Sequence, residues 1–283
     1  MKIKDLRTSF VNSLSGLYDS AEILSFFYLL SEEILGLTRV NVAINLDKIL
    51  SDDEISDFDA AKNRLLHQEP IQYIIGKTDF YGLPFVVNEN VLIPRPETEE
   101  LVDWIIKDRL NSNDPIAILD IGTGSGCIAI SLAKKIPEAR VYAIDISEPA
   151  IKVAEENAKL NKVNVTFIKA NILETQDLSI DFDVIVSNPP YVRELEKIEM
   201  KPNVLDNEPS RALFVSDDQP LVFYEKITSL AKNKLKKEGS LYFEINQYLG
   251  LETKDMIENL GFTSVEIRKD LYGNDRMIKA CFD

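Results

Sequence analysis

Apolar residues in the first 75 positions recur at the spacing of an α-helix. The recurring positions are Leu17, Ala21, Leu24, Phe27, Leu30, Ile34 and Leu37. Residues three or four positions apart share one face of a helix, so this pattern predicts helices that bury a common stripe. Ser51 and Glu54 have the spacing of a capping box, in which each side chain accepts a hydrogen bond from the other residue's backbone amide. We therefore predict a small helical domain over residues 1–75.

The pattern changes over residues 76–98. Short apolar runs between residues 79 and 96 alternate with Gly, Asn and Pro, which is typical of two short strands with turns between them. We interpret this segment as a β-hairpin linker. A helix is predicted to follow Pro94 and Pro96, from about residue 97 to residue 109.

From residue 116 onward, strand patterns alternate with helix patterns. Strands are predicted at 116–121, 140–146, 165–170, 182–187, 240–245, 264–269 and 276–281, and helices at 126–136, 148–160, 219–236 and 252–260. The nearly continuous apolar run at 116–121 is typical of a central parallel strand. The last two strands are joined by too few residues for a parallel crossover, so they should be antiparallel. We predict an α/β fold over residues 99–283: a Rossmann-like, mainly parallel sheet that ends in an antiparallel strand pair.

The composition sets limits on location and chemistry. A length of 283 residues suggests two domains. The longest apolar stretch, residues 23–30, is far shorter than the roughly 18 residues of a membrane span. Asp5 and Arg7 stand where a signal peptide would become apolar. We expect a cytoplasmic protein without a membrane partner, in which Cys127 and Cys281 are reduced core residues.

The charge argues against nucleic acid as the main partner. The net charge is −15, whereas a protein that binds a duplex gains affinity by neutralising phosphates with Lys and Arg. A basic protein partner fits better. His67 is the one histidine of the sequence, so a Ser-His-Asp triad or a two-histidine metal site is not expected, and we predict no metal site.

A glycine-rich loop follows the first strand of the predicted sheet. Gly122, Gly124 and Gly126 have the spacing GxGxG, whereas the dinucleotide fingerprint GxGxxG would need its third glycine at position 127. A tight strand-to-helix turn is the simplest alternative. Glycines let the backbone approach a ligand closely, so the loop also suits an adenosyl cofactor, with Thr123 and Ser125 among its ligands.

Polar residues at the ends of the next strands extend this candidate site. Ligands of doubly wound sheets lie outside the carboxyl ends of the strands. Asp145 stands there and could bind both hydroxyls of a ribose. Asp145 could instead cap the next helix, but Ser147 is also a candidate for that cap. Asn171 and Ile172 follow the third strand and are candidates for clamping an adenine ring.

The sequence Asn188-Pro189-Pro190-Tyr191 closes the fourth strand. Consecutive prolines restrict their own backbone and that of the preceding residue, so Asn188 should point into the cleft in one defined way. Its side-chain oxygen could accept one hydrogen of a substrate NH2 group, and the Pro189 carbonyl could accept the other. Tyr191 could stack on a planar substrate group. We predict that these four residues are catalytic and bind the substrate, and that Asn188 also contacts the cofactor.

These motifs resemble those of the amino methyltransferases. The general resemblance lies in residues 120–126 and 188–191. A closer resemblance, to the peptide chain release factor N5-glutamine methyltransferases, lies in residues 70–76, 80–82, 91–99, 208–213 and 273–276. The resemblance covers nearly the whole chain. It implies an enzyme that uses S-adenosylmethionine to methylate the glutamine in the Gly-Gly-Gln motif of class-1 release factors. It also implies that the helical domain docks the release factor; we further expect a monomer.

Three other functions are considered. A DNA adenine-N6 methyltransferase would use the same chemistry at Asn188, but it would need a basic face and a domain that holds a flipped base. A non-catalytic module that only holds the cofactor would not need an intact Asn188–Tyr191 motif. An NAD-dependent dehydrogenase is disfavoured by the glycine spacing of the loop.

Overall fold

The computed structural model describes residues 1–109 and 115–282, which form two compact units. The helical unit contains Met1–Gly76 and Lys201–Asn207, and the sheet unit contains Lys77–Met200 and the described residues from Glu208 onward. The predicted segment 99–283 includes residues 110–114 and 283, which lie outside the described residues. In the part of the chain that is described, no helix is both long and apolar enough to cross a bilayer.

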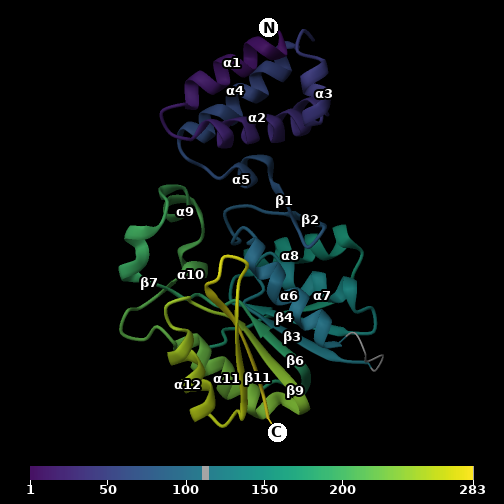
Figure 1. The fold of residues 1–283 in the computed structure, drawn as a ribbon. Coiled ribbons are helices and arrows are strands. Elements are labelled where there is room, and N and C mark those ends of the chain that lie inside the picture. Colours follow the sequence, from purple (N-terminus) through teal and green to yellow (C-terminus); the bar gives the residue numbers. More distant parts are fainter. Residues whose placement is uncertain (110–114, 283) are drawn as a thin grey trace. The chain divides into compact units, whose positions relative to one another are not determined.

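The helical unit, whose residues 1–76 are drawn in purple and blue in Figure 1 and whose α9 is green, has no named strand among its described residues. Its helices are α1 (Ile3–Leu14), α2 (Ser20–Leu35), α3 (Arg39–Ile44), α4 (Asp52–Leu66), α5 (Ile71–Ile75) and α9 (Pro202–Asn207). The predicted capping box at the start of α4 is confirmed. The Glu54 amide donates to Ser51 Oγ at 3.1 Å, and the Ser51 amide donates to the Glu54 carboxylate at 2.7 Å.

The core of the helical unit shows where the predicted apolar stripe was wrong. α2 buries Ile23, Phe27 and Leu30, whereas Leu17 is 48 % exposed. The reason is local: Asp19 accepts the Glu22 amide at 2.8 Å and starts α2 after Leu17, which therefore lies in the preceding turn. Aromatic packing centred on Phe27, with neighbours Phe10 and Phe58, then fills the core.

The segment Lys201–Asn207 joins the helical unit from a distant part of the sequence. The Asn207 side chain donates to the Gln68 carbonyl at 3.3 Å. The sequence pattern did not predict α9, because six residues are too few to show helical periodicity.

The predicted hairpin forms from β1 (Lys77–Phe80) and β2 (Leu83–Val86), which pair antiparallel. Its two-residue turn places Tyr81 and Gly82 at φ of +51° and +72°, as a hairpin turn compatible with strand twist requires. The hairpin is part of the sheet unit and joins its hydrophobic core through Phe80 and Phe85, both fully buried.

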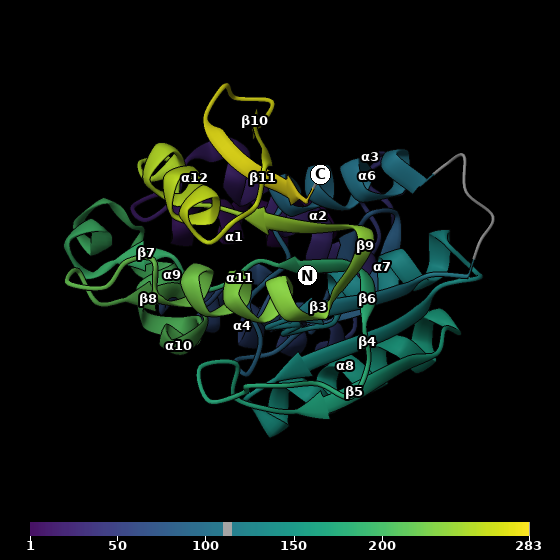
Figure 2. The ribbon, with the colours of Figure 1, turned by 90° about the horizontal axis from the view of Figure 1, so that it is seen from below.

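The sheet unit is built on a seven-stranded sheet of order β10-β11-β9-β6-β3-β4-β5 (Figure 2). The strands are β3 (Ala117–Ile121), β4 (Arg140–Asp145), β5 (Val165–Lys169), β6 (Phe182–Ser187), β9 (Leu235–Glu244), β10 (Ser264–Lys269) and β11 (Asp275–Cys281). The neighbours from β9 to β5 pair in parallel, and β11 is antiparallel to both β9 and β10. The predicted Rossmann-like sheet is therefore confirmed.

Helices cover both faces of this sheet. α6 (Pro96–Arg109), α7 (Cys127–Lys135) and α8 (Glu148–Asn161) pack on one face, and α11 (Val222–Lys234) and α12 (Gly250–Asn259) pack on the other. Because successive side chains of a strand point to opposite faces, neighbours on β3 enter different cores. Ile118 packs with the α6–α8 layer and Leu119 with the α11–α12 layer.

The boundary predicted between the helix at 219–236 and the strand at 240–245 was wrong, as was the start of that helix, which is Val222. β9 begins at Leu235 rather than at residue 240, and α11 ends at Lys234. The strand reaches back past Glu238, whose φ is +67°, and its pairing with β6 shifts register there. An irregularity of this kind interrupts the period-two pattern from which strands are recognised.

The remaining short elements follow β6. They are β7 (Val192–Arg193), the 3-10 helix η1 (Glu194–Glu199), α10 (Ser210–Leu213) and β8 (Phe214–Val215), with β7 and β8 paired in parallel. β3 lies between β4 and β6, so the chain turns in opposite directions on its two sides. Such a reversal opens a crevice at the carboxyl ends of the strands, where ligands of these folds bind.

Candidate active site

A cavity of about 400 Å³ opens at the carboxyl ends of β3, β4 and β6. Its walls come from four segments at strand ends and from three segments elsewhere in the sheet unit. They contribute Ile121, Gly122 and Gly124; Ile144–Ser147 and Ala150; Ala170–Leu173; Ser187–Pro190; and, from elsewhere in the sheet unit, Glu89–Leu92, Pro209, Arg211, Ala212, Phe223 and Ile227. The size matches the roughly 300–1,000 Å³ of small-molecule sites. Gly122, Gly124, Asp145, Asn171, Ile172 and the start of the Asn188 motif therefore meet in one place.

The glycine loop is fixed to the neighbouring strand. The amides of Gly122 and Thr123 both donate to the Ile144 carbonyl, at 2.9 and 3.1 Å. Gly122 and Gly124 adopt φ of +74° and +55°, a region that side chains other than glycine rarely enter. The loop thus presents bare backbone to the cavity.

Three of the predicted cofactor residues, Thr123, Ser125 and Gly126, lie next to the cavity and do not line it. Thr123 donates to the buried Asp120 carboxylate at 2.6 Å, and Ser125 is buried with its carbonyl bonded by Asn157. A Cβ at Gly126 would lie 2.8 Å from Ile130 Cδ1 and 3.1 Å from Ala154 Cβ. Gly126 therefore allows α7 and α8 to pack closely, and its role as a cofactor ligand stays a prediction.

Burial raises the pKa of Asp120 to about 7, and the nearby Asp145 adds to this effect. Asp120 is fully buried at the end of β3, and its Oδ2 also accepts the Ala129 amide at 3.3 Å. Its bonds to Thr123 and α7 hold the loop from inside the protein. Asp120 supports the cavity wall without facing the cavity.

Asp145 ends β4 at the cavity wall. Its Oδ2 accepts the Gly124 amide at 2.9 Å, and its Oδ1 accepts the Ser147 amide at 2.8 Å. Ser147 Oγ caps α8 by accepting the Ala150 amide at 3.3 Å, so the predicted cap is confirmed and Asp145 does not occupy that role. Each carboxylate oxygen keeps a further lone pair for a hydroxyl group.

The residues after β5 line the other side of the cavity. Asn171 folds onto its own loop, where its Oδ1 accepts the Leu173 amide at 3.1 Å and its Nδ2 donates to Glu174 at 2.8 Å. Ile172 is buried and offers an apolar surface. Ile172 and Phe223 therefore present apolar side chains to the cavity, and the hydrogen bonds of Asn171 shape the loop that carries Ile172.

The Asn188 motif leaves β6 directly into the cavity. The preceding Ser187 donates its hydroxyl to the Ile121 carbonyl at 2.7 Å and fixes the end of β6 to β3. Asn188 Nδ2 donates to Thr98 Oγ1 at 3.2 Å. Pro189 is buried, and both Pro189 and Pro190 line the cavity. The bond to Thr98 uses the amide nitrogen and leaves the Asn188 oxygen for a ligand.

Tyr191 lies beside this wall, and among the described residues it is not one that lines the cavity. Its hydroxyl donates to Glu244 Oε1 at 3.0 Å, and Arg276 approaches the same hydroxyl at 3.5 Å. Burial, followed by the Glu244 charge, holds the pKa of Tyr191 well above its usual range. The predicted stacking of Tyr191 on a substrate stays a prediction.

Several residues of this site were not predicted. Glu208 is almost fully buried. Its carboxylate accepts a hydrogen bond from the Arg95 guanidinium at 2.6 Å and another from the Ile93 amide at 3.3 Å. This pair joins the segment 91–95 to the segment 208–213 at the cavity. Both segments carry the family resemblance, which is the signal that could have identified Arg95 and Glu208. Thr98 and Glu244 were likewise missed.

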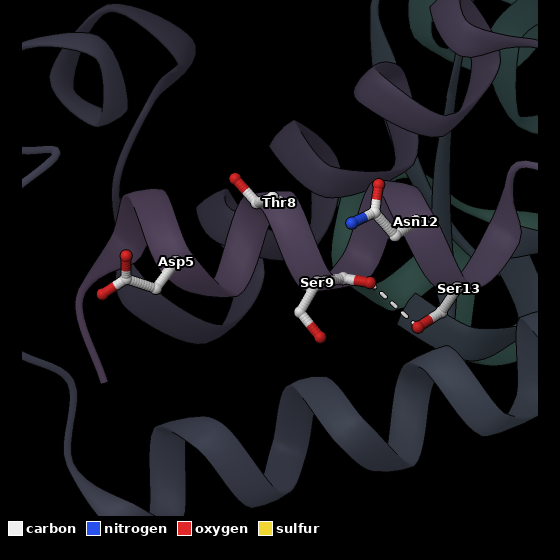
Figure 3. Close-up of a pocket in the computed structure, with 5 residues that line it drawn as sticks. All are labelled: Asp5, Thr8, Ser9, Asn12 and Ser13. Atoms are coloured by element: carbon white, nitrogen blue, oxygen red, sulfur yellow. Dashed lines mark hydrogen bonds between the residues drawn. The ribbon is translucent and has the colours of Figure 1, made fainter.

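A second hollow lies on the polar face of α1, lined by Asp5, Thr8, Ser9, Asn12 and Ser13 (Figure 3). Thr8 and Ser13 donate their hydroxyls to carbonyls one turn earlier, at 2.9 and 2.8 Å. These two hydroxyl groups are therefore satisfied by their own helix, and we assign no function to this surface.

Family models match two parts of the chain. One described as "PrmC N-terminal domain" matches residues 5–76, and one described as "Methyltransferase small domain" matches residues 104–207. A solved methyltransferase from Pyrococcus furiosus, 20% identical, has a TM-score of 0.50 and covers 78% of this chain and 98% of its own. At that identity the likeness concerns the fold.

Curated relatives match over the full length. The release factor glutamine methyltransferase of Flavobacterium psychrophilum is 55% identical, and the match covers 100% of both chains. The release factor glutamine methyltransferase of Bacteroides thetaiotaomicron is 44% identical, with 95% of this chain and 96% of the relative covered. Together with the motifs that meet at the cavity, this similarity shows that the chain belongs to the release factor glutamine methyltransferase family.

Proposed function

We propose that this enzyme transfers a methyl group from S-adenosylmethionine to the side-chain amide nitrogen of the glutamine in the Gly-Gly-Gln motif of class-1 release factors. The observation that carries the proposal is the orientation of Asn188 at the cavity. Its Nδ2 is bonded to Thr98 and its oxygen remains available to accept a hydrogen. Membership in the family excludes the dehydrogenase and the cofactor-binding module as alternatives.

The residues at the cavity fit this cofactor. Asp145 can accept hydrogen bonds from the ribose hydroxyls, and the glycine loop lets the backbone approach the amino acid part closely. Ile172 supplies an apolar surface for the adenine. When bound, the sulfonium group supplies an electrophilic methyl group. The assignment of Gly122, Gly124, Asp145 and Asn171 to cofactor binding belongs to this proposal.

The substrate nitrogen presents a chemical difficulty that Asn188 and Pro189 address. An amide nitrogen is a poor nucleophile, because its lone pair is delocalised into the carbonyl. Asn188 Oδ1 and the Pro189 carbonyl can each accept one hydrogen of the NH2 group, which fixes the direction of attack and stabilises positive charge on the nitrogen. Such orientation and preorganised acceptors supply several kcal/mol. With the cofactor bound, formation of the N–C bond would be matched by cleavage of the C–S bond, which would release the thioether S-adenosylhomocysteine and one proton from the nitrogen to water.

We expect the purified protein to methylate an intact class-1 release factor once, at the glutamine of its Gly-Gly-Gln motif. Peptide mapping by mass spectrometry locates the added methyl group. A release factor with that glutamine replaced by glutamate is the control and should stay unmodified. Methylation of the replaced substrate, or of adenine in duplex DNA, would contradict the proposed substrate.

The helical unit is proposed to dock the release factor. A tripeptide is too small for specific affinity, since stable protein interfaces bury about 1,600 Å² in total. The helical unit has its own core, and all residues assigned to methyl transfer belong to the sheet unit. A second contact surface is therefore expected on the helical unit.

Removing the helical unit should affect recognition more than chemistry. The shortened chain begins at Lys77 and replaces Lys201–Asn207 by a Gly-Ser linker, because these residues pack with the part that is removed. Its KM for whole release factor should rise on the order of 100-fold, about 2.8 kcal/mol, while its weak activity on a free Gly-Gly-Gln peptide changes much less. Equal losses on both substrates, in a variant that still binds S-adenosylmethionine, would contradict the docking role.

A further inference from the structure

Two buried groups and one partly buried group connect Asn188 to the interior of the sheet unit. Thr98 Oγ1 donates to Glu244 Oε2 at 2.5 Å, and the Tyr191 hydroxyl donates to Glu244 Oε1 at 3.0 Å. Thr98 and Glu244 are 2 % and 1 % exposed. We call Thr98, Glu244 and Tyr191 the amide-orienting network. They come from the first turn of α6, the end of β9 and the residue after the two prolines.

The directions of these hydrogen bonds determine one another. A carboxylate accepts hydrogen bonds and cannot donate them, whereas a threonine hydroxyl has one hydrogen and two lone pairs. Since Thr98 gives its hydrogen to Glu244, only its lone pairs remain for Asn188. Asn188 must therefore turn its NH2 group, and not its oxygen, toward Thr98.

We propose that Thr98 and Glu244 are positioning residues that fix the flip of the Asn188 amide, so that its oxygen faces the substrate nitrogen. The oxygen and the NH2 group of an amide are nearly equivalent in shape. Without this network, the NH2 group of Asn188 could therefore face the substrate. An NH2 group there would oppose the hydrogens of the glutamine amide. The effect that we expect on kcat rests on the proposed function.

The surroundings hold Glu244 in this role. Burial, with a smaller contribution from Glu97, holds the pKa of Glu244 above its ordinary value, and the bonds from Thr98 and Tyr191 and the charge of Arg276 counteract part of this rise. Arg276 is held by Asp270, whose Oδ2 accepts its Nε at 3.2 Å. Arg276 therefore places a positive charge near Glu244, which favours the ionised carboxylate.

Thr98→Val tests the hydroxyl with little change of shape. We expect kcat to fall on the order of 10- to 100-fold, since small misplacements of catalytic groups have effects of this size, while the affinity for S-adenosylmethionine changes less than about threefold. Thr98→Ser restores the hydroxyl and should recover most of kcat. Thr253→Val is the matched control, because Thr253 is equally buried and donates to the Leu249 carbonyl at 2.7 Å.

Glu244→Gln tests the direction of the bonds. A glutamine amide can accept from only one of Thr98 and Tyr191, and its NH2 group faces the other, so the Asn188 flip is no longer determined. We expect a fall in kcat like that of Thr98→Val. Asp108→Asn is the matched control, because Asp108 also accepts a tyrosine hydroxyl, from Tyr242 at 2.7 Å, on another part of the unit.

A readout that needs no substrate completes the test. In NMR spectra of the full chain, the Asn188 side-chain NH2 resonance should shift in Thr98→Val and Glu244→Gln, and stay in place in Thr253→Val. If wild-type protein methylates release factor and Thr98→Val keeps kcat within about threefold of Thr253→Val, the positioning role is overturned. An unshifted resonance overturns it as well. If wild-type protein fails on release factor, the proposed function fails, and the resonance still decides the orientation.

Discussion

Replacing Asn188 by alanine should nearly abolish methyl transfer and leave cofactor binding intact. The variant removes one of the two acceptors proposed for the substrate NH2 group. Removing one preorganised hydrogen-bonding group from a site of developing charge costs roughly 100- to 1,000-fold in kcat. Asn188 follows β6 and Asp145 ends β4, with β3 between these two strands, so the affinity for S-adenosylmethionine should change little. Single-turnover methylation of a release factor, with calorimetry of cofactor binding, measures both.

The variant Asn188→Asp provides a second test of the same mechanism. Aspartate keeps an acceptor oxygen toward the cavity but places a second acceptor against Thr98 Oγ1, where the wild-type protein has an NH2 donor. Thr98 would then have to share its one hydrogen between the introduced carboxylate and Glu244. The activity of this variant should lie between those of wild type and Asn188→Ala. An alanine variant that turns over within a few-fold of wild type would show that the two-acceptor mechanism is wrong.

The parts of the fold that were predicted correctly depend on local signals. β6 has its predicted bounds because the apolar run Phe182–Ser187 is buried almost throughout and ends at prolines. The capping box at Ser51 and the turn at Tyr81 and Gly82 likewise depend on neighbouring residues. The carboxyl-end rule for parallel sheets then brings Gly122, Asp145 and Asn188 together, because it needs only the order of strands.

The parts that were missed depend on contacts between distant residues. Thr98 meets Glu244 across 146 positions, and Arg95 meets Glu208 across 113. The hydrophobic periodicity along the chain does not indicate which distant residues form such a pair. The same holds for α9, which is short and belongs to the helical unit through contacts with residues far before it. A buried acid such as Glu244, within the apolar end of β9, is the one local sign of a polar network.

Replacing Asp145 by alanine should weaken the binding of S-adenosylmethionine more than any other single change at the cofactor end of the cavity. Two hydrogen bonds from ribose hydroxyls to a carboxylate are lost, each worth about 1.5–3 kcal/mol. Together they amount to about 3–6 kcal/mol, or roughly a 100- to 10,000-fold increase in Kd. The alanine also releases the Gly124 and Ser147 amides, which Asp145 holds at 2.9 and 2.8 Å.

The loss of these two backbone bonds must be separated from the loss of the ribose contacts. Asp183→Ala provides the comparison, because Asp183 accepts the Ala117 amide at 2.7 Å and pairs with Lys236 at 2.7 Å, at the amino ends of β3 and β6. Both variants should lower the unfolding temperature of the free protein. Only Asp145→Ala should also lose the further rise in unfolding temperature that S-adenosylmethionine causes, since a ligand stabilises the state it binds. Unchanged cofactor affinity by calorimetry would remove Asp145 from the site and leave it a purely structural role in holding the glycine loop.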